Sequence, residues 1–331
     1  MTRQSRFLLP AALYSLPLFG VFLVWGSIDL FVPRDRASTI LGSMKDAKPA
    51  LGADALAAFY YMGLGYFLVA IACLTSLAWC LWTIHKRYPE LNSDERPYFI
   101  FGLVLSFVVP LGALAAHYPY PGCGFVAIDD CSTWTLLEST VHKVYNSVYS
   151  VKFAFRYDAD VFACLVFVTY LVSLSTVTLI VGTKPDQPTP TSGVMTDEER
   201  RQALNMILLL TAIVLIASTL SSRLRFDVGL ATLGAPPTKE VPNVPFAAYQ
   251  TIASAIMAFW ASVLSVFIAL VYVPGAMLLN FRTSPSGSID FNSWLKLDGT
   301  NFEKLVKVAA IASPALVNKL LDIFSIATKG A

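Results

Sequence analysis

Hydroxyl groups at helical spacing inside apolar runs are the residues of this chain whose chemistry could serve a function. Three sets of residues have spacings of three, four or seven, which place the members of each set on one helix face. The sets are Thr169, Ser173 and Thr176; Thr211, Ser218 and Ser222; and Ser254, Ala258 and Ser262. Small and hydroxylated residues let helices approach closely and bond to one another. They could also line an uncharged path for ions or water. The pattern therefore predicts tight helix packing, a pore, or both.

The elements that must position these groups are six long apolar runs: Phe7–Val32, Ala57–Ile84, Pro97–Ala116, Val161–Val181, Ala203–Leu220 and Ala247–Leu279. Each run has about 20 residues or more, enough for a helix to cross a hydrocarbon core of about 30 Å. Hydrophobic residues make up 56% of the chain and charged residues 14%, against about 25% charged in soluble domains. We expect an all-α integral membrane protein, with six transmembrane helices in residues 1–280 and the first run retained as an anchor.

Charged groups are scarce in the middle of these runs. Asp29 and His117 lie at the ends of their runs, and Arg223, Arg225 and Asp227 follow the fifth run. Proton-coupled transporters and redox pumps usually need buried acids or histidines, so their absence counts against both classes. We find no catalytic motif and no cluster of cysteine and histidine at metal-binding spacing. The expectation is a protein that is not an enzyme and has no cofactor or metal. The net charge of +2 gives no indication of nucleic-acid binding.

Cysteines indicate the orientation. Cys123 and Cys131 lie in a polar, turn-rich loop, residues 118–158, after the third run. Two cysteines that close a short loop outside the bilayer are typical of a disulfide, which requires an oxidising compartment. This predicts an extracytoplasmic loop and a multi-pass protein of the plasma (inner) membrane with both termini in the cytoplasm. A pair of free loop thiols is the alternative, because spacing alone does not establish geometry.

The extracytoplasmic segments show two competing periods. Apolar residues recur every three or four positions from Trp134, which predicts an amphipathic helix to about Val148. A strand period of two appears in Leu224, Phe226, Val228 and Leu230, and also from Tyr149 to Tyr157. We therefore expect a small outer layer that could include a short β-pair. The alternative is a loop lying on the lipid headgroups.

The cytoplasmic segments contain helix signals. Thr196 and Glu199 have the spacing of a capping box, so the fifth helix should begin there. In the tail, residues 281–331, Ser313-Pro314 is suited to begin a helix. Its apolar face would bind an oligomer or a partner through Leu316, Leu320, Ile323 and Phe324. Lying on the inner leaflet, or docking on the protein's own helix ends, are the alternatives.

Three function classes follow from these patterns. The favoured class is a homo-oligomeric channel, pore or membrane sensor, because hydroxyl faces combine with few buried charges. The alternative is an accessory subunit of a larger membrane complex, favoured by the aromatic outer segments and the apolar tail. A substrate transporter comes third, because buried charges are missing. The expected partners are the lipid bilayer and either further copies of the chain or other membrane subunits.

Overall fold

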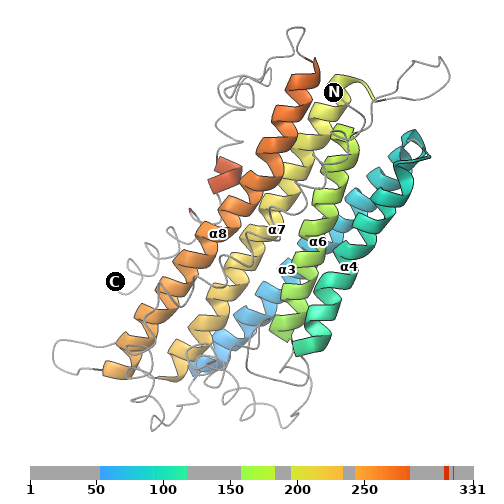
Figure 1. Cartoon of the computed structure of the whole chain (residues 1–331). Helices are drawn as coiled ribbons and strands as arrows, with labels where there is room; N and C mark the ends of the chain where they lie inside the picture. The colour runs from blue at the N-terminus through green and yellow to red at the C-terminus, as the bar shows by residue number, and fades with distance from the viewer. Residues whose placement is uncertain are drawn as a thin grey trace.

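The chain forms a bundle of long helices (Figure 1). The computed structural model describes residues 53–91, 93–117, 158–182, 195–233, 243–283, 309–312 and 316. These residues are almost entirely helical, with no strand among them: α3 (Ala53–Arg87), the short η1 (Tyr88–Glu90), α4 (Arg96–His117), α6 (Asp158–Gly182), α7 (Asp197–Thr232) and α8 (Val244–Thr283). Five of the six apolar runs lie inside these helices. The run Phe7–Val32 and most of loop 118–158 lie outside the described residues.

Consecutive long helices run in opposite directions. Contacts between the helices show these directions. Tyr66 stacks on Phe162, with ring centroids 4.6 Å apart, and further along both helices Cys80 approaches Ser173. Thus α3 and α6 are parallel. In contrast, α7 and α8 are antiparallel. Asn205, near the beginning of α7, lies beside Tyr272, near the end of α8, and Gly229 lies beside Tyr249 at the opposite ends of the two helices. The last residues of α3 and α6 therefore lie at the same end of the bundle, the η1 end, as Figure 1 shows.

Helix α6 lies at the centre and contacts α3, α4, α7 and α8. Of its most apolar 18-residue window, 83% is buried, against 33% for α3 and 50% for α7. A helix that is apolar on all sides is suited to the core of a protein or to a membrane span. The sequence of α6, which has no charged residue from Val161 to Gly182, fits this central position.

Three helices are long and apolar enough to cross a membrane, judged by length and composition: Leu56–Glu90, Val161–Gly182 and Glu198–Ala231. This is fewer than the six spans that the sequence predicts. The described apolar part of α4, Arg96–Gly112, is shorter, and the first run lies outside the described residues. The all-helical prediction is confirmed for the described residues, and an apolar bundle of this kind is consistent with membrane association.

The strand predicted at the end of the fifth run is wrong. Leu224 to Leu230 continue α7, which ends at Thr232. Phe226, Val228 and Leu230 are all buried, since both neighbouring helices cover this end of α7. Arg223, Arg225 and Asp227 alternate with these apolar residues, which imitates a strand period of two. Within α7, however, Arg223 and Asp227 lie one helical turn apart and pair at 3.5 Å.

The capping box is confirmed. The Glu199 amide donates to Thr196 Oγ1 at 3.2 Å, and the Thr196 amide donates to Glu199 Oε2 at 2.7 Å. These two bonds satisfy donors that would otherwise lack a partner at the beginning of α7. The beginning of α7 is therefore set by two polar residues that precede its apolar run.

The described part of the tail contacts the bundle. Residues 309–312 form a helical turn, and Ala310 and Ile311 pack against the large core cluster formed by α3, α6, α7 and α8. Leu316, one of the predicted partner-binding residues, is 50% exposed. Leu320, Ile323 and Phe324 lie outside the described residues, so their predicted role in binding stays a prediction.

Candidate functional site

Small polar side chains gather around α6 in the interior of the bundle, and we call this set the polar layer. All of its members are less than 5% exposed: Cys73, Ser76 and Cys80 of α3, Thr169, Ser173 and Thr176 of α6, and Thr211 of α7. Four of the sequence-predicted residues are therefore in the core of the bundle, and three of them share α6. The thiols of Cys73 and Cys80 are free.

The α6 hydroxyls of the polar layer are satisfied within their own helix. Each donates to the carbonyl four residues earlier: Thr169 to Leu165, Ser173 to Thr169 and Thr176 to Val172, at 2.7 to 2.8 Å. Such bonds allow a hydroxyl to be buried without a partner on another helix. In this arrangement these hydroxyls pack between helices, and they are not turned toward a ligand.

Further polar contacts join α6 to each of its four neighbours. Toward α3, Ser173 Oγ lies 3.7 Å from Cys80 Sγ, and toward α4, Ser175 Oγ lies 3.2 Å from Ser106 Oγ. The contact to α8 runs from the Tyr170 hydroxyl to the Phe267 carbonyl at 3.1 Å, and that to α7 from Arg200 Nη1 to the Ile180 carbonyl at 2.7 Å. Since polar groups in an apolar interior favour arrangements that satisfy them, these contacts help to fix the position of α6.

Two hydroxyls of the polar layer are exceptions. Ser76 Oγ and Thr211 Oγ1 are buried and form no hydrogen bond within the described structure. Ser76 is near the Cys80 thiol, while Thr211 has mainly apolar neighbours. A buried hydroxyl without a partner costs about 1–3 kcal/mol. These two groups are therefore the part of the layer that local bonding leaves unexplained.

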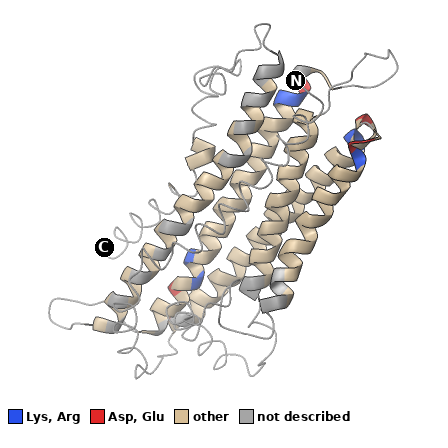
Figure 2. Ribbon diagram, viewed as in Figure 1, with Lys and Arg blue, Asp and Glu red and all other residues tan. Residues whose placement is uncertain are grey.

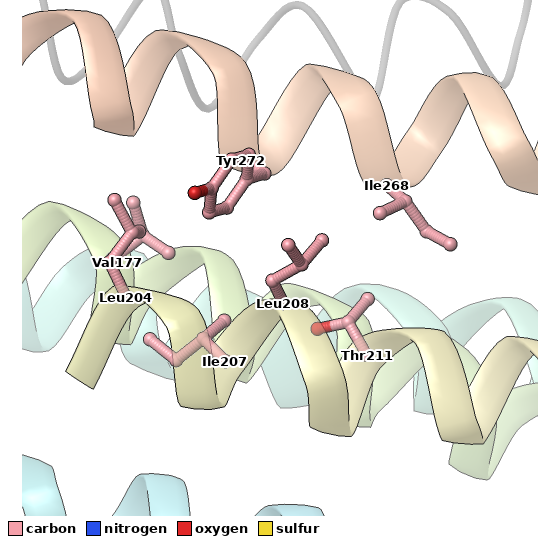
Figure 3. Close-up of a pocket in the computed structure, with 7 residues that line it drawn as sticks. All are labelled: Val177, Leu204, Ile207, Leu208, Thr211, Ile268 and Tyr272. Atoms are coloured by element: carbon pink, nitrogen blue, oxygen red, sulfur yellow. The ribbon is translucent and has the colours of Figure 1, made fainter. Parts of the chain in front are cut away.

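Thr211 lines a narrow cleft between α6, α7 and α8 (Figure 3). The cleft contains about 180 Å³ of empty space, open space at its mouth included, but no part of it is wide enough for a water molecule. The other lining residues are apolar except for the hydroxyl of one tyrosine: Val177, Leu204, Ile207, Leu208, Ile268 and Tyr272. In this conformation the bundle is closed at the cleft.

The remaining predicted residues are less buried. Ser218 and Ser222 on α7 are half-buried, as are Ser254 and Ala258 on α8, and Ser262 is exposed. The Ser262 hydroxyl donates to the Ala258 carbonyl at 2.8 Å. The buried face of α8 is formed instead by Ala253, Met257 and Ala261. The described structure therefore does not bring the Ser254 ladder into the polar layer.

Charged side chains lie toward the ends of the described helices, as Figure 2 shows. At the η1 end Arg87 pairs with Glu90 at 2.7 Å, and toward the opposite end Arg223 pairs with Asp227 at 3.5 Å. Within the described residues, no three histidine, cysteine or acidic side chains are grouped so that they could hold a metal ion. Any chemistry in the middle of the bundle would therefore depend on hydroxyls, thiols and backbone carbonyls.

Sequence reasoning missed several polar contacts between helices. Arg200, a charged residue in the first turn of α7, is only 5% exposed and donates to carbonyls of Ile180 and Met195. Tyr272 donates to Asn205 Oδ1 at 3.1 Å. The presence of asparagine and tyrosine inside apolar runs could have indicated the Tyr272–Asn205 bond, because such side chains normally form a hydrogen bond when they are buried.

The Tyr272–Asn205 bond leads to a prediction. Tyr272→Phe should lower the free energy of unfolding by only about 0.6 kcal/mol, the average for a hydrogen bond between membrane helices. Tyr170→Phe, which removes the bond to a backbone carbonyl, should have an effect of similar size. Denaturant titration of both variants in micelles would measure this. A loss several times larger would mean that these hydroxyls do more than join two helices.

Comparison with known proteins gives no relative: no protein-family model, curated protein or solved structure matches the chain. The argument about function therefore rests on this chain's own residues and their geometry.

Proposed function

We propose that this protein is a multi-pass membrane protein that acts as a homo-oligomeric channel, pore or membrane sensor. The observation that supports this proposal is the polar layer, a set of uncharged hydroxyls and thiols in the middle of an apolar bundle. Uncharged polar groups in the middle of the bundle would lower the energy barrier to the passage of water or a weakly hydrated ion. Because the layer has no fixed charge, it would not bind the ion too tightly for release. In the described conformation the layer is closed by apolar side chains, so conduction or sensing would need a second conformation.

A second candidate is an accessory subunit of a larger membrane complex. The observation that favours it is the large exposed apolar surface of α3 and α4. Several aromatic side chains there are about 60% exposed or more: Tyr60, Tyr61, Phe67, Tyr98 and Phe101. Lipid or another membrane subunit could cover this surface. A substrate transporter is disfavoured, because the runs hold no buried charged pair that would couple transport to an ion.

The proposed topology has six spans in the plasma (inner) membrane, with both termini in the cytoplasm. The run Phe7–Val32 would be the first span, and α3, α4, α6, α7 and α8 the others. The alternating helix directions support this arrangement, because they put the connections after α3 and α6 at one end of the bundle. The loop 118–158 would then lie at the other, extracytoplasmic end.

This topology predicts a disulfide between Cys123 and Cys131, two residues outside the described part of the chain. A membrane-impermeant thiol reagent should leave both unlabelled on intact cells and should label both after mild reduction. Cys73, Cys80 and Cys164, which are buried, serve as an internal control that stays unlabelled. Labelling of the loop cysteines without reductant would show free thiols and remove the argument for orientation.

The mass of the purified complex separates the candidate functions. A channel or sensor made of identical subunits should have a mass in detergent that is a multiple of 36.1 kDa. Co-purification of unlike subunits in fixed ratio would support the accessory-subunit proposal, whereas a single copy would contradict both and favour a transporter.

A further inference from the structure

We propose that α8 has a hinge at Pro274-Gly275 and that its last segment, residues 275–283, is the gate of the cleft lined by Thr211. The segment closes the end of the cleft that faces the η1 end of the bundle, and bending at the hinge opens it. The inference deepens the proposed function and rests on it, because a gate of this kind serves a channel or sensor.

The hinge follows from two adjacent residues inside a long helix. Pro274 lies within α8, which continues to Thr283. Because proline has no backbone N–H, the Leu270 carbonyl cannot receive the usual helical hydrogen bond from residue 274. The next residue is glycine, which has the least restricted backbone of all residues. Sharp bends in helices occur at proline, so this is the point at which α8 bends most easily.

Gly275 packs closely against one end of the cleft. A Cβ atom at Gly275 would lie 2.9 Å from Val177 Cγ1 and 3.3 Å from Leu204 Cδ1. Val177 is buried and β-branched, so its side chain has little freedom to move aside in a helix. Both contacted residues line the cleft, and Figure 3 shows them at the end opposite Thr211 and Ile268. In the described conformation Gly275 therefore closes this end.

Hydrogen bonds hold α8 in place before the hinge. The Tyr170 hydroxyl donates to a backbone carbonyl of α8, and the Tyr272 hydroxyl donates to Asn205 Oδ1, both at 3.1 Å. After the hinge, the described side chains are those of Ala276 and Leu279, which are buried and apolar. These side chains hold the last segment to the bundle by packing alone. The last segment is therefore the part of α8 that can move while the rest stays in place.

Thr211 shows what the opening would expose. Its hydroxyl is buried, with 3% of the residue exposed, and forms no hydrogen bond within the described structure. The cleft that it lines is too narrow for a water molecule in the described conformation. Movement of the last segment away from Val177 and Leu204 uncovers the cleft from the η1 end, so that water reaches this hydroxyl.

A thiol introduced at position 211 provides a test. The full-length protein would carry Thr211→Cys, keep its native cysteines and be placed in liposomes. A small, charged methanethiosulfonate reagent reacts only where water reaches the thiol, and mass spectrometry gives the rates at position 211 and at Cys164 separately. Cys164 is buried in a different cluster, formed by residues of α3, α4 and α6. It therefore reports any general loosening of the bundle.

Pro274→Ala should reduce the rate at position 211 about fivefold, because it restores one backbone hydrogen bond, which corresponds to a factor of that order. The melting temperature should stay the same or rise, since alanine is favoured over proline within a helix. Pro110→Ala is the matched control, because Pro110 lies inside α4, which does not line the cleft. This control should react at the wild-type rate. An unchanged rate in Pro274→Ala would overturn the inference.

Gly275→Ala should have the opposite effect. The added Cβ atom would hold the last segment away from Val177, so the rate at position 211 should rise several times while that at Cys164 is unchanged. Replacing Val177 by alanine as well removes the overlap and should lower the rate at position 211 again. An equal rise at position 211 and at Cys164 would show general loosening and would overturn the inference.

Flux measured in the same liposomes separates this inference from the proposed function. Reaction at position 211 that depends on Pro274, in a protein without measurable flux, would support the hinge and contradict the channel. Flux that is the same in wild type, Pro274→Ala and Gly275→Ala would support the channel and overturn the role of the last segment as its gate.

Discussion

Gly229→Ala should destabilise the bundle strongly. A Cβ atom at Gly229 would overlap the hydroxyl and ring of Tyr249, which is fully buried on α8. Neither helix can move aside easily, because α7 also packs against α3 at this end. Overpacking of this kind costs about 1–3 kcal/mol and sometimes more. Thermal unfolding in detergent should show a clearly lower melting temperature, or the variant should fail to accumulate in the membrane.

Gly63→Ala is the matched control. Gly63 lies in α3, and a Cβ atom added there would meet nothing within 4 Å. Since alanine is favoured over glycine within a helix by about 1 kcal/mol, this variant should be as stable as the wild type or more so. A second control is the pair Gly229→Ala and Tyr249→Ala together, which should be no less stable than Tyr249→Ala alone. If Gly229→Ala behaved like Gly63→Ala, the close contact between α7 and α8 would be wrong.

Arg200→Met should have the second large effect. The Arg200 guanidinium is buried and donates to the carbonyls of Ile180 and Met195, so it joins the end of α6 to the beginning of α7. Methionine keeps the length and apolar surface of the side chain but leaves the Ile180 carbonyl without this donor. Hydrogen bonds to charged groups contribute about 1.5–3 kcal/mol, and unfolding of the variant in detergent should show a loss of that order.

Lys86→Met controls for the removal of a positive charge at the same end of the bundle. Lys86 is exposed and its ammonium lies 5.3 Å from the centroid of the Trp82 ring. An exposed contact of this kind contributes about 0.5–1 kcal/mol, so the loss should be smaller than for Arg200→Met. Equal losses for the two variants would mean that charge, and not the bond to α6, determines stability at this end.

Much of the fold could be predicted from the sequence because long apolar runs have few alternatives to helices. The runs now seen as α3, α4, α6 and α8 were predicted with ends within four residues of those of the helices. Thr196 with Glu199 marked the beginning of α7, but the predicted run ended at Leu220, whereas α7 continues to Thr232. The strand at Leu224–Leu230 was wrong, because Arg225 and Asp227 alternate with apolar residues and imitate a strand period, although α7 continues through them. The number of spans remains a proposal beyond the three helices that satisfy length and composition.

The candidate site could be predicted only in part. Helical spacing placed Thr169, Ser173 and Thr176 on one face, because residues three and four apart share a face whatever that face contacts, and all three are buried on α6. It could not show which hydroxyls bond within their own helix, since that depends on rotamers. Nor could it show the register between α3 and α7, because that register is set by the packing of Gly65 against Ser221. Cys73 and Cys80 have no distinguishing spacing in the sequence, and only their neighbours in the structure place them in the polar layer.

The most direct test of the account is a flux measurement on the purified protein in liposomes. The account predicts passage of water or monovalent ions that is reduced by Thr176→Val/Thr211→Val, which remove two hydroxyls of the polar layer, while the oligomeric mass is unchanged. Flux should appear only under the voltage, ligand or membrane tension that opens the bundle, because the described conformation is closed. No flux above that of empty liposomes under any of these conditions would contradict the account and favour an accessory subunit.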